Sequence, residues 1–489
     1  MIRRAAGLLI TALAAVSAPA AAPPPGPAER ATIEALARIA REDPSLKAVI
    51  ATNPAAIAQA RTLDRQRMAR GLLFGRPILI KDNIETADQP TTAGSLALAA
   101  NVTGRDAPIV AALRRAGAVI LGKTNLSEWA NIRSTASVSG WSAVGGQTRN
   151  PHDPARSPGG SSAGSGAAVA AGLVDLAIGT ETDGSITGPA AFNGIVGLKP
   201  TVGLVSRARI VPISHSQDTP GPMTRTVRDA ALVLAAIAGS DPADPATAQA
   251  DAHRTDYAAT LVPGALKGVR IGVMRFDTGF SAGTDAVFET ALARLRAQGA
   301  ILVDIARSGF DSTIGADEHV VLMTEFKADL NAYLADAAPA VATRTLADLI
   351  AFNSAHADME MPLFGQESFV EAEAGRPPDN PDYLAARDRA KRHAGPDGID
   401  RLLRDNDVAV LVAPTRNPAS LIDPVNGDSG RRGPGTGSIA AVAGYPHLTV
   451  PMGAVKGLPV GLSFIGPAWS EARLLALGAA YESARGPIR

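Results

Sequence analysis

The sequence contains no cysteine, and this single absence removes several kinds of chemistry. A thiol nucleophile, a disulfide framework and a cysteine-ligated metal site are all excluded. An excess of charge is also missing, because 47 basic and 47 acidic residues give a formal net charge of zero. A balanced chain has no general attraction to nucleic acid, so we expect no nucleic-acid partner. Aromatic residues are few, yet 46% of the chain is apolar, which is enough for a large core.

Long hydrophobic runs are missing too, apart from one near the start. Arg3 and Arg4 precede the run AAGLLITALAAVSAPA, and small residues follow it. This order is typical of a secretory signal peptide, and the run is too short and too rich in alanine for a membrane span. We predict a signal peptide over residues 1–22, a short Ala/Pro-rich linker over residues 23–30, and a periplasmic or secreted protein without membrane attachment after cleavage. A disordered Ala/Pro leader is the alternative.

Histidine and lysine are scarce, and neither forms a familiar catalytic or metal motif. The histidines show no HExxH pattern or close metal spacing, so we predict no metal site and no metal cofactor. No lysine lies three residues after a serine, which excludes the SxxK arrangement. His215 lies near Asp218 and leaves a Ser-His-Asp triad open as a minor alternative. The histidines are His152, His215, His253, His319, His356, His393 and His447.

The most informative stretch is residues 157–189, SPGGSSAGSGAAVAAGLVDLAIGTETDGSITGP. Ala, Gly and Ser dominate residues 161–172, where we predict a closely packed helix that ends at Gly172. A short buried strand is predicted over residues 173–178. The turn-formers of GTETDGS allow consecutive backbone N–H groups to point into one cavity and bind a developing oxyanion. Ser185 ends that loop and is our candidate nucleophile.

A serine hydroxyl needs a base, and Lys81 is our candidate for it. The apolar run Ile78–Leu79–Ile80 leads directly into Lys81, which predicts a strand that carries the amine into the protein interior. Burial lowers the pKa of a lysine and favours its neutral, basic form. The structural alternative is an ion pair with Asp82 or Glu85.

Two sequence motifs would indicate other functions, namely nucleotide binding and an α/β-hydrolase. GAVILGKT at residues 117–124 matches the P-loop pattern, but its four interior residues are apolar and predict a strand rather than a phosphate-binding loop. GSSAG at residues 160–164 matches GxSxG with Ser162 at its centre. A nucleophile elbow follows a strand directly, whereas a proline-rich loop precedes this serine, so we do not predict an α/β-hydrolase.

Several segments together resemble the amidase signature family. They are PILIKDNI, GAVILGKTNLSEWAN, SPGGSSAGS, GTETDGSI, GIVGLKPTVGLVSR, SQDTPGPMTRTVRDAA and AGYPHLTVPMG, and the resemblance covers nearly all of the chain after residue 30. It implies an α/β fold with a large mixed sheet covered by helices on both faces. It also implies a Ser-cisSer-Lys triad and no cofactor.

Carried over motif by motif, the resemblance assigns a role to each site residue. Lys81 matches the family lysine, Ser161 the cis-serine after Gly160, and Ser185 the acylated serine. The implied oxyanion hole is formed by the backbone of the loop that ends at this nucleophile, and one further residue supports the loop. These residues are Thr182, Asp183 and Gly184, together with Ser185 itself, and the supporting residue is Thr180.

The chain also shows the order of an α/β protein. DAPIVAALRRAG followed by AVILGK, and later FETALARLRAQGAILVDI, repeat a helix–glycine–strand unit. Ile33, Leu36, Ala37 and Ala40 fall at helical spacing and predict an amphipathic first helix. Since no linker separates the candidate catalytic residues, we predict one domain over residues 31–489. A helical cap is predicted over residues 317–405.

The substrate class follows from finer features of the resemblance. SLALA, GWSAVGGQTRNP, ISHSQDTPGPM and LADLIAFNSAH resemble family members that remove the C-terminal amide from peptides. Many relatives carry an arginine where this chain has Thr187, which weakens a role as a glutamyl-tRNA amidotransferase subunit. The alternatives are a general acylamide or aryl amidase and, from another class, a noncatalytic binding protein. We expect a small-molecule or peptide amide as substrate, and a monomer or homodimer.

Overall fold

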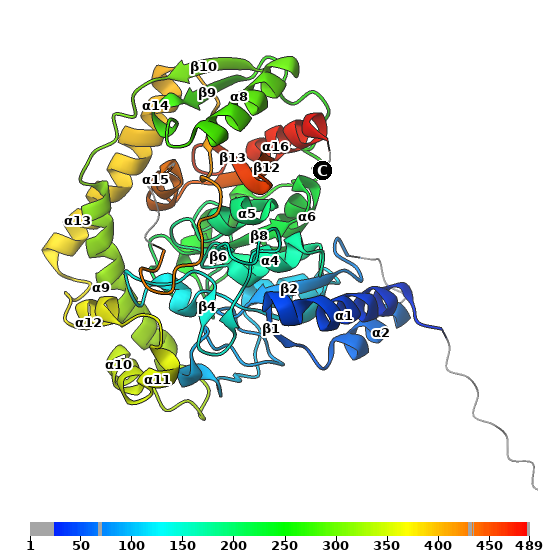
Figure 1. Ribbon diagram of the computed structural model, residues 1–489, viewed down its shortest axis with the longest axis vertical. Helices are drawn as coiled ribbons and strands as arrows, with labels where there is room; N and C mark the ends of the chain where they lie inside the picture. The colour runs from blue at the N-terminus through cyan, green and yellow to red at the C-terminus, as the bar shows by residue number, and fades with distance from the viewer. Residues whose placement is uncertain (1–23, 67–70, 429–432, 434, 487–489) are drawn as a thin grey trace, which may run out of the picture.

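A mixed eleven-stranded sheet runs through the whole molecule, from β1 and β3 at one end to β9 and β10 at the other (Figure 1). The computed structural model describes residues 24–66, 71–428, 433 and 435–486. The signal peptide expected over residues 1–22 lies outside this range. In sheet order the strands are β1 (Val49–Thr52), β3 (Val119–Thr124), β2 (Pro77–Lys81), β6 (Leu176–Glu181), β8 (Thr219–Thr224), β7 (Val196–Lys199), β12 (His447–Val455), β13 (Leu458–Ile465), β11 (Val410–Pro414), β9 (Arg270–Met274) and β10 (Ile301–Ile305).

Parallel and antiparallel pairs alternate in blocks across this sheet. β3, β2 and β6 are parallel neighbours, as are β11, β9 and β10. The strands between these blocks, from β8 to β13, pair in the antiparallel sense. The predicted α/β fold with a large mixed sheet is therefore confirmed. A separate two-stranded ribbon is formed by β4 (Trp141–Ser142) and β5 (Gly146–Gln147).

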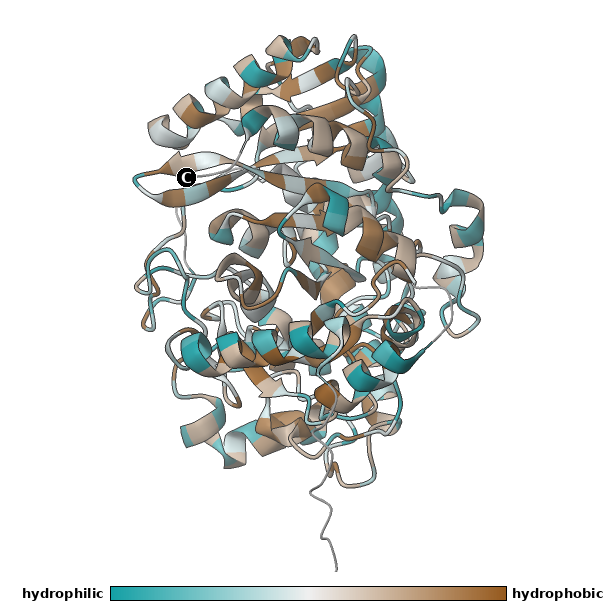
Figure 2. Cartoon of the chain, turned by 90° about the vertical axis from the view of Figure 1, so that its right-hand side faces the viewer, coloured by the Kyte–Doolittle hydropathy of each residue, from teal (hydrophilic) through white to brown (hydrophobic). Residues whose placement is uncertain are grey.

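Helices cover both faces of the sheet. One face packs against α3 (Pro108–Arg115), α6 (Val227–Ile237), α8 (Ala282–Ala297) and α16 (Glu471–Arg485). The other packs against α1 (Pro27–Leu46), α2 (Ala56–Arg65), α4 (Ala163–Ala170), α5 (Thr187–Asn193) and α15 (Thr436–Ala443). In Figure 2 polar residues gather on the outer helices, whereas the inner strands are mostly apolar.

The alternation along β2 decides the side of the sheet on which its last residue lies. Ile78 and Ile80 belong to the core on the α3 and α6 face, while Leu79 belongs to the core on the α1 and α4 face. Successive side chains of a strand point to opposite faces. Lys81 therefore shares its face with Leu79 and points toward the start of α4.

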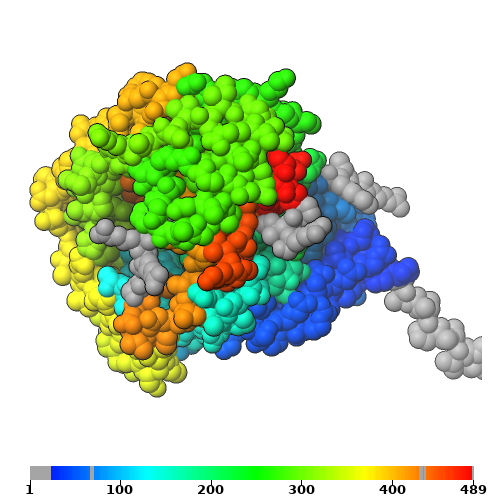
Figure 3. Space-filling model, turned by 45° about the horizontal axis from the view of Figure 1, so that its top comes forward, coloured from blue at the N-terminus to red at the C-terminus, as the bar shows by residue number. Residues whose placement is uncertain are grey.

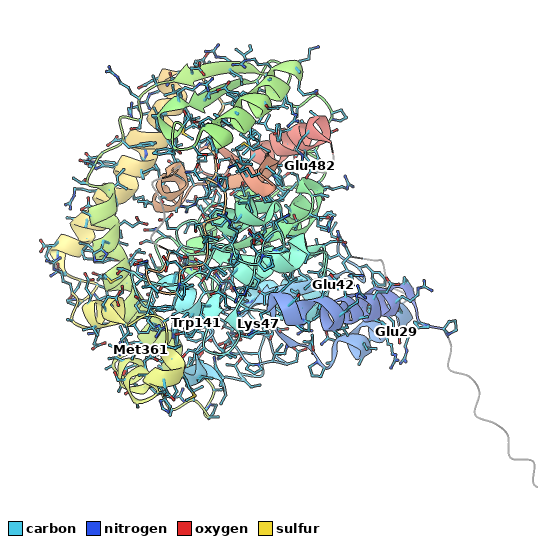
Figure 4. All side chains as sticks on the ribbon, in the orientation of Figure 1. Glu29, Glu42, Lys47, Trp141, Met361 and Glu482 are labelled. Atoms are coloured by element: carbon cyan, nitrogen blue, oxygen red, sulfur yellow. The ribbon has the colours of Figure 1, made fainter. Side chains whose placement is uncertain are left out.

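Contacts between the covering helices and several short elements complete this part of the fold. Glu482 of α16, labelled in Figure 4, accepts a hydrogen bond from the backbone N–H of Val227 at 3.2 Å and ties α16 to α6. α8 and β10 lie at the surface beside part of the β12–β13 hairpin (Figure 3). The short elements are η1 (Leu96–Leu98), η2 (Glu128–Asn131), η3 (Pro245–Gln249), α7 (Ala250–His253) and η4 (Arg275–Asp277).

Residues 314–405, all of which are described, contain helices and no strand. They form the left side of the view in Figure 1. α9 packs its apolar side, including Phe326 and Leu330, against Leu98 and Trp129 of the sheet domain. The helices are α9 (Ile314–Ala335), α10 (Leu346–Ala355), α11 (Ala357–Glu360), α12 (Glu367–Glu373), α13 (Pro381–Ala394), η5 (Gly395–Ile399) and α14 (Asp400–Asp405).

The first helix and the strand after α4 differ from their predicted form. α1 begins at Pro27, inside the stretch 23–30 expected to be a linker, because proline is favoured in the first turn of a helix. Its buried side includes Ala35 and Ile39, whereas Ile33 is 39% exposed, so the predicted apolar face is wrong. The strand predicted over residues 173–178 runs from Leu176 to Glu181. Among the described helices, none is long and apolar enough to cross a membrane.

Candidate active site

Lys81 lies at the carboxyl end of β2 and is completely buried. Its Nζ donates hydrogen bonds to Ser161 Oγ at 2.8 Å, to Thr180 Oγ1 at 2.8 Å and to the backbone oxygen of Thr180 at 3.3 Å. Asn83 Nδ2 donates to the same Thr180 hydroxyl at 3.0 Å. The amine is thus held between Ser161, the predicted cis-serine, and Thr180, the residue expected to support the loop before Ser185.

Burial controls the charge of this amine. Desolvation lowers the pKa of Lys81 to about 7, although the nearby Asp218 and Glu181 carboxylates favour the charged form. Burial also raises the pKa of Asp218 to about 6, while hydrogen bonds from Thr182 Oγ1 and from backbone N–H groups act in the opposite direction. Near neutral pH, Lys81 therefore exchanges between its charged and neutral forms.

The ion-pair alternative for Lys81 is wrong. Asp82 pairs instead with Lys123, with 2.9 Å between Oδ1 and Nζ. Glu85 pairs with Arg105, with 2.8 Å between Oε2 and Nε. Among the described residues, no salt bridge to Lys81 is found, which leaves its amine directed at hydroxyl and carbonyl groups.

The two serine loops meet at Lys81. Ser161 is completely buried, and the peptide bond between Gly160 and Ser161 is cis, as the resemblance implies. The backbone N–H of Ser162 donates to the backbone oxygen of Ser185 at 3.1 Å and joins the loops directly. Ser185 is 9% exposed, so its loop borders the protein surface.

The loop before Ser185 is braced from several sides. Thr182 Oγ1 donates to Asp218 Oδ1 at 2.5 Å, and the Glu181 carboxylate accepts the backbone N–H groups of Ile186 and Thr187 at 2.7 and 2.9 Å. Gly184 has φ of 75°, a conformation that glycine adopts without strain.

An oxyanion hole also requires backbone N–H groups in this loop that are free to donate. Within the described part of the chain, the backbone N–H groups of Asp183, Gly184 and Ser185 donate to no protein acceptor. Unpaired N–H groups next to a candidate nucleophile are able to bind a developing oxyanion.

Neither Ser162, at the centre of the GxSxG match, nor His215, of the alternative Ser-His-Asp triad, has a catalytic arrangement. Ser162 Oγ donates to the Thr180 backbone oxygen at 3.1 Å and accepts from the Thr180 N–H at 3.2 Å, so this hydroxyl holds α4 against β6. His215 does not approach Asp218 in a triad. Its Nδ1 lies 2.9 Å from Asp329 Oδ2, and its Nε2 lies 3.3 Å from Glu325 Oε1. Because both ring nitrogens face carboxylates, this cluster is an ion-pair arrangement.

Sequence reasoning missed several residues that surround the site. Asn83 lies inside the quoted motif PILIKDNI but was assigned no role, and Asp218, inside SQDTPGPM, was considered only as the acid of a Ser-His-Asp triad. Gln217, from the same second motif, donates through Nε2 to the Thr182 backbone oxygen at 3.2 Å and to Glu318 Oε1 at 2.9 Å. Glu318 comes from α9, and no local pattern links that helix to the loop.

A serine loop, a buried lysine and unpaired backbone donors on this sheet define a class of amide hydrolases. The family described as Amidase matches residues 30–475 of the chain. The chain therefore belongs to the amidase signature family, and it is a hydrolase that acts on amides. This result sets aside the noncatalytic alternative.

Two solved peptide amidases and one amidase sequence are similar to nearly the whole chain. The native peptide amidase of Stenotrophomonas maltophilia is 51% identical, with a TM-score of 0.88 and 93% of each chain covered. A peptide amidase solved with the competitive inhibitor chymostatin is also 51% identical, with a TM-score of 0.89 and coverage of 93% and 94%. A probable amidase of Arabidopsis thaliana is 39% identical over 463 residues, covering 92% of this chain and 85% of the relative.

Proposed function

We propose that the protein hydrolyses the C-terminal amide of peptides through an acyl-enzyme on Ser185. The observation that carries the proposal is the 2.8 Å hydrogen bond between Lys81 Nζ and Ser161 Oγ, in a buried site joined to the Ser185 loop. Neutral Lys81 accepts the proton of Ser161, which accepts the proton of Ser185. The Ser185 oxygen attacks the carboxamide carbon, and the backbone N–H groups of Asp183 and Gly184 stabilise the oxyanion.

The same relay completes the reaction. It returns the proton to the leaving nitrogen, the carbon–nitrogen bond breaks and ammonia departs. Water then loses a proton to the relay and attacks the acyl carbon, the bond between that carbon and Ser185 Oγ breaks, and the relay returns the proton to Ser185 Oγ. The products are the free peptide acid and regenerated Ser185. Every step uses this chain's own groups.

The similarity to peptide amidases supports peptide amides as the substrate class. The deciding assay measures ammonia release from a C-terminally amidated dipeptide and from a simple aliphatic amide. The methyl ester and the free acid of the same dipeptide, which carry no terminal carboxamide, are the controls. We expect fast release from the peptide amide, no cleavage of the internal peptide bond, and loss of turnover in Ser185→Ala. Release from the simple amide alone would make the protein a general amidase.

We also propose that the protein is exported to the periplasm or secreted. The support is the order of Arg3, Arg4, the apolar run and the small residues that follow it. Expression in a Gram-negative host, followed by fractionation and N-terminal sequencing, tests this directly. A mature N-terminus near residue 23 in the periplasmic fraction is expected, whereas an intact cytosolic chain would contradict export.

A further inference from the structure

Arg416 lies against the loop that carries Ser185 and against the first turn of α5, although it follows a strand that is distant from β6 in the sheet. It follows β11 by two residues. Its Nη2 lies 2.6 Å from the position that a Cβ would occupy at Gly184, and its Nε lies 3.7 Å from the corresponding position at Gly188. The Gly188 position is also 3.9 Å from the backbone oxygen of Gly160, the residue before Ser161. The two glycines thus make room for a guanidinium beside the nucleophile.

Among the described residues, no hydrogen bond or salt bridge to Arg416 is found, although the residue is half-buried. The neighbouring Asp183 accepts a hydrogen bond from Ser438 Oγ at 3.0 Å, and Glu181 accepts the N–H groups at the start of α5. Since a guanidinium offers five donors in a fixed plane, an unpaired one at a reaction centre is suited to an acceptor on the substrate.

We propose that Arg416 is a substrate-binding residue, which donates hydrogen bonds to the carbonyl oxygen of the peptide unit preceding the scissile carboxamide. This inference rests on the proposed function. The preceding carbonyl oxygen is the group that a peptide amide has and a simple aliphatic amide lacks. One residue of extended chain spans roughly 3.5 Å, which suits a group bound beside the loop that carries Ser185.

The surrounding charges favour a neutral carbonyl over a substrate carboxylate. Asp183 lies in the loop next to Arg416, and the Glu318 side chain is hydrogen-bonded to Gln217 nearby. Burial raises the pKa of Glu318 to about 8, and the Asp183 charge adds to this effect, so a further negative charge is unfavourable in this region. An acidic substrate group would add a further negative charge there, whereas a peptide carbonyl adds none.

The test compares two amides that differ only in the proposed acceptor. N-acetyl-L-leucinamide contains the preceding carbonyl, whereas 4-methylpentanamide keeps the side chain and the scissile amide but lacks the acetamido group. kcat/KM is measured for both with the mature enzyme, Arg416→Met and Arg416→Lys. The matched control is Arg225→Met, which replaces an arginine that is 51% exposed and ion-paired at the surface.

We expect Arg416→Met to lower kcat/KM for N-acetyl-L-leucinamide about 10- to 100-fold, as for the loss of a charge-assisted hydrogen bond, and to change that for 4-methylpentanamide less than about 2-fold. Arg416→Lys should fall between Arg416→Met and the native enzyme. Equal losses on both amides would show that Arg416 only supports the loop, and would overturn the inference. An unchanged ratio in Arg416→Met would overturn it as well.

Failure of the proposed function gives a different result. A native enzyme that shows no preference for N-acetyl-L-leucinamide over 4-methylpentanamide would contradict peptide specificity itself. Calorimetric binding of N-acetyl-L-leucinamide to Ser185→Ala, with and without Arg416→Met, is independent of turnover. The inference requires weaker binding in the double variant, and equal binding would overturn it even if the enzyme hydrolyses peptide amides.

Discussion

At the scale of single residues, the protonation of Lys81 should determine the pH dependence of catalysis. The neutral amine is the active form, and burial lowers its pKa to about 7. The neutral fraction therefore rises about 10-fold per pH unit below 7 and saturates above it. We expect kcat/KM to increase with pH and to level off near pH 8. A pH–rate profile on a peptide amide measures this, and a flat profile between pH 5 and 8 would contradict the role of Lys81.

Asp218 offers a second variant for the same measurement. Its carboxylate favours the charged form of Lys81, so Asp218→Asn removes a negative charge and should lower the pKa of the amine further. The inflection of the profile should then move to lower pH. A shift to higher pH would mean that Asp218 does not act on Lys81 through its charge.

The three neighbouring serines should respond differently to substitution. Ser161→Ala and Ser185→Ala remove a step of the relay and should each lower kcat at least about 1,000-fold. Ser162→Ala keeps the Lys81–Ser161 contact but loses two hydrogen bonds to Thr180. It should keep most of its turnover while the free energy of unfolding falls by about 1–3 kcal/mol. Ammonia release and denaturant unfolding, measured on the same preparations, separate the two effects.

At this scale, the sequence could indicate Lys81 but not exclude its ion-pair alternative. The run that ends at Lys81 predicts a buried amine, and this is what the strand provides. The choice of partner depended on Lys123 and Arg105, which occupy Asp82 and Glu85. Both of these cations come from other segments, so no local pattern around Lys81 contains the answer.

At the scale of elements, α4 depends on glycine for its close approach to the sheet. A Cβ at Gly164 would lie 2.3 Å from the backbone oxygen of Ala48 and 2.5 Å from that of Asn125. Backbone atoms are unable to move aside cheaply, so Gly164→Ala should lower the free energy of unfolding by about 2 kcal/mol or more. Gly315→Ala in α9 is the matched control, because nothing lies within 4 Å of its Cβ position.

The control should change stability in the opposite direction. Alanine is favoured over glycine in a helix, so Gly315→Ala should raise the free energy of unfolding by about 0.5–1 kcal/mol. Urea unfolding followed by circular dichroism measures both variants. Similar changes in the two proteins would contradict the proposed close packing of α4.

The periodic pattern of apolar residues predicted which segments are helices and which are strands. It was less accurate for their buried faces and for the residues at which they begin and end. α1 carries alanine on several sides, so composition does not distinguish Ile33 from the truly buried Ala35 and Ile39. β6 extends beyond its apolar residues to Thr180 and Glu181. Lys81 donates to Thr180 Oγ1 and the backbone N–H of Ile186 donates to Glu181 Oε2, and only the folded chain supplies such partners.

At the scale of the whole molecule, α9 connects the helical region 314–405 to the catalytic loops. Glu325 of α9 accepts hydrogen bonds from the Ser214 hydroxyl, from the Ser216 N–H at 3.0 Å and from Tyr383 Oη at 2.7 Å. Ser214 and Ser216 precede Asp218, which braces Thr182 in the candidate oxyanion loop. The sequence predicted a helical region near the site, but not that this buried carboxylate attaches it.

His215 should make this attachment depend on pH. Its ring is 47% exposed and pairs with Asp329 and Glu325. The hydrogen bond with Asp329 raises the pKa of His215, burial and Arg207 oppose the rise, and the charges of Glu325 and Asp329 add to it. Since the folded pKa lies above the unfolded one, the stabilisation is complete below the unfolded pKa of about 6.5 and is lost as pH rises through the folded pKa.

Hydrogen exchange measures this attachment directly. We expect the protection of residues 213–218, corrected for the intrinsic rate, to fall as pH rises through the raised pKa of His215, because the attraction to the carboxylates is then lost. His215→Gln should show low protection at every pH, whereas His319→Gln, on the outer side of α9 with Glu371, should behave like the native protein. Protection independent of pH in the native protein would contradict the coupling.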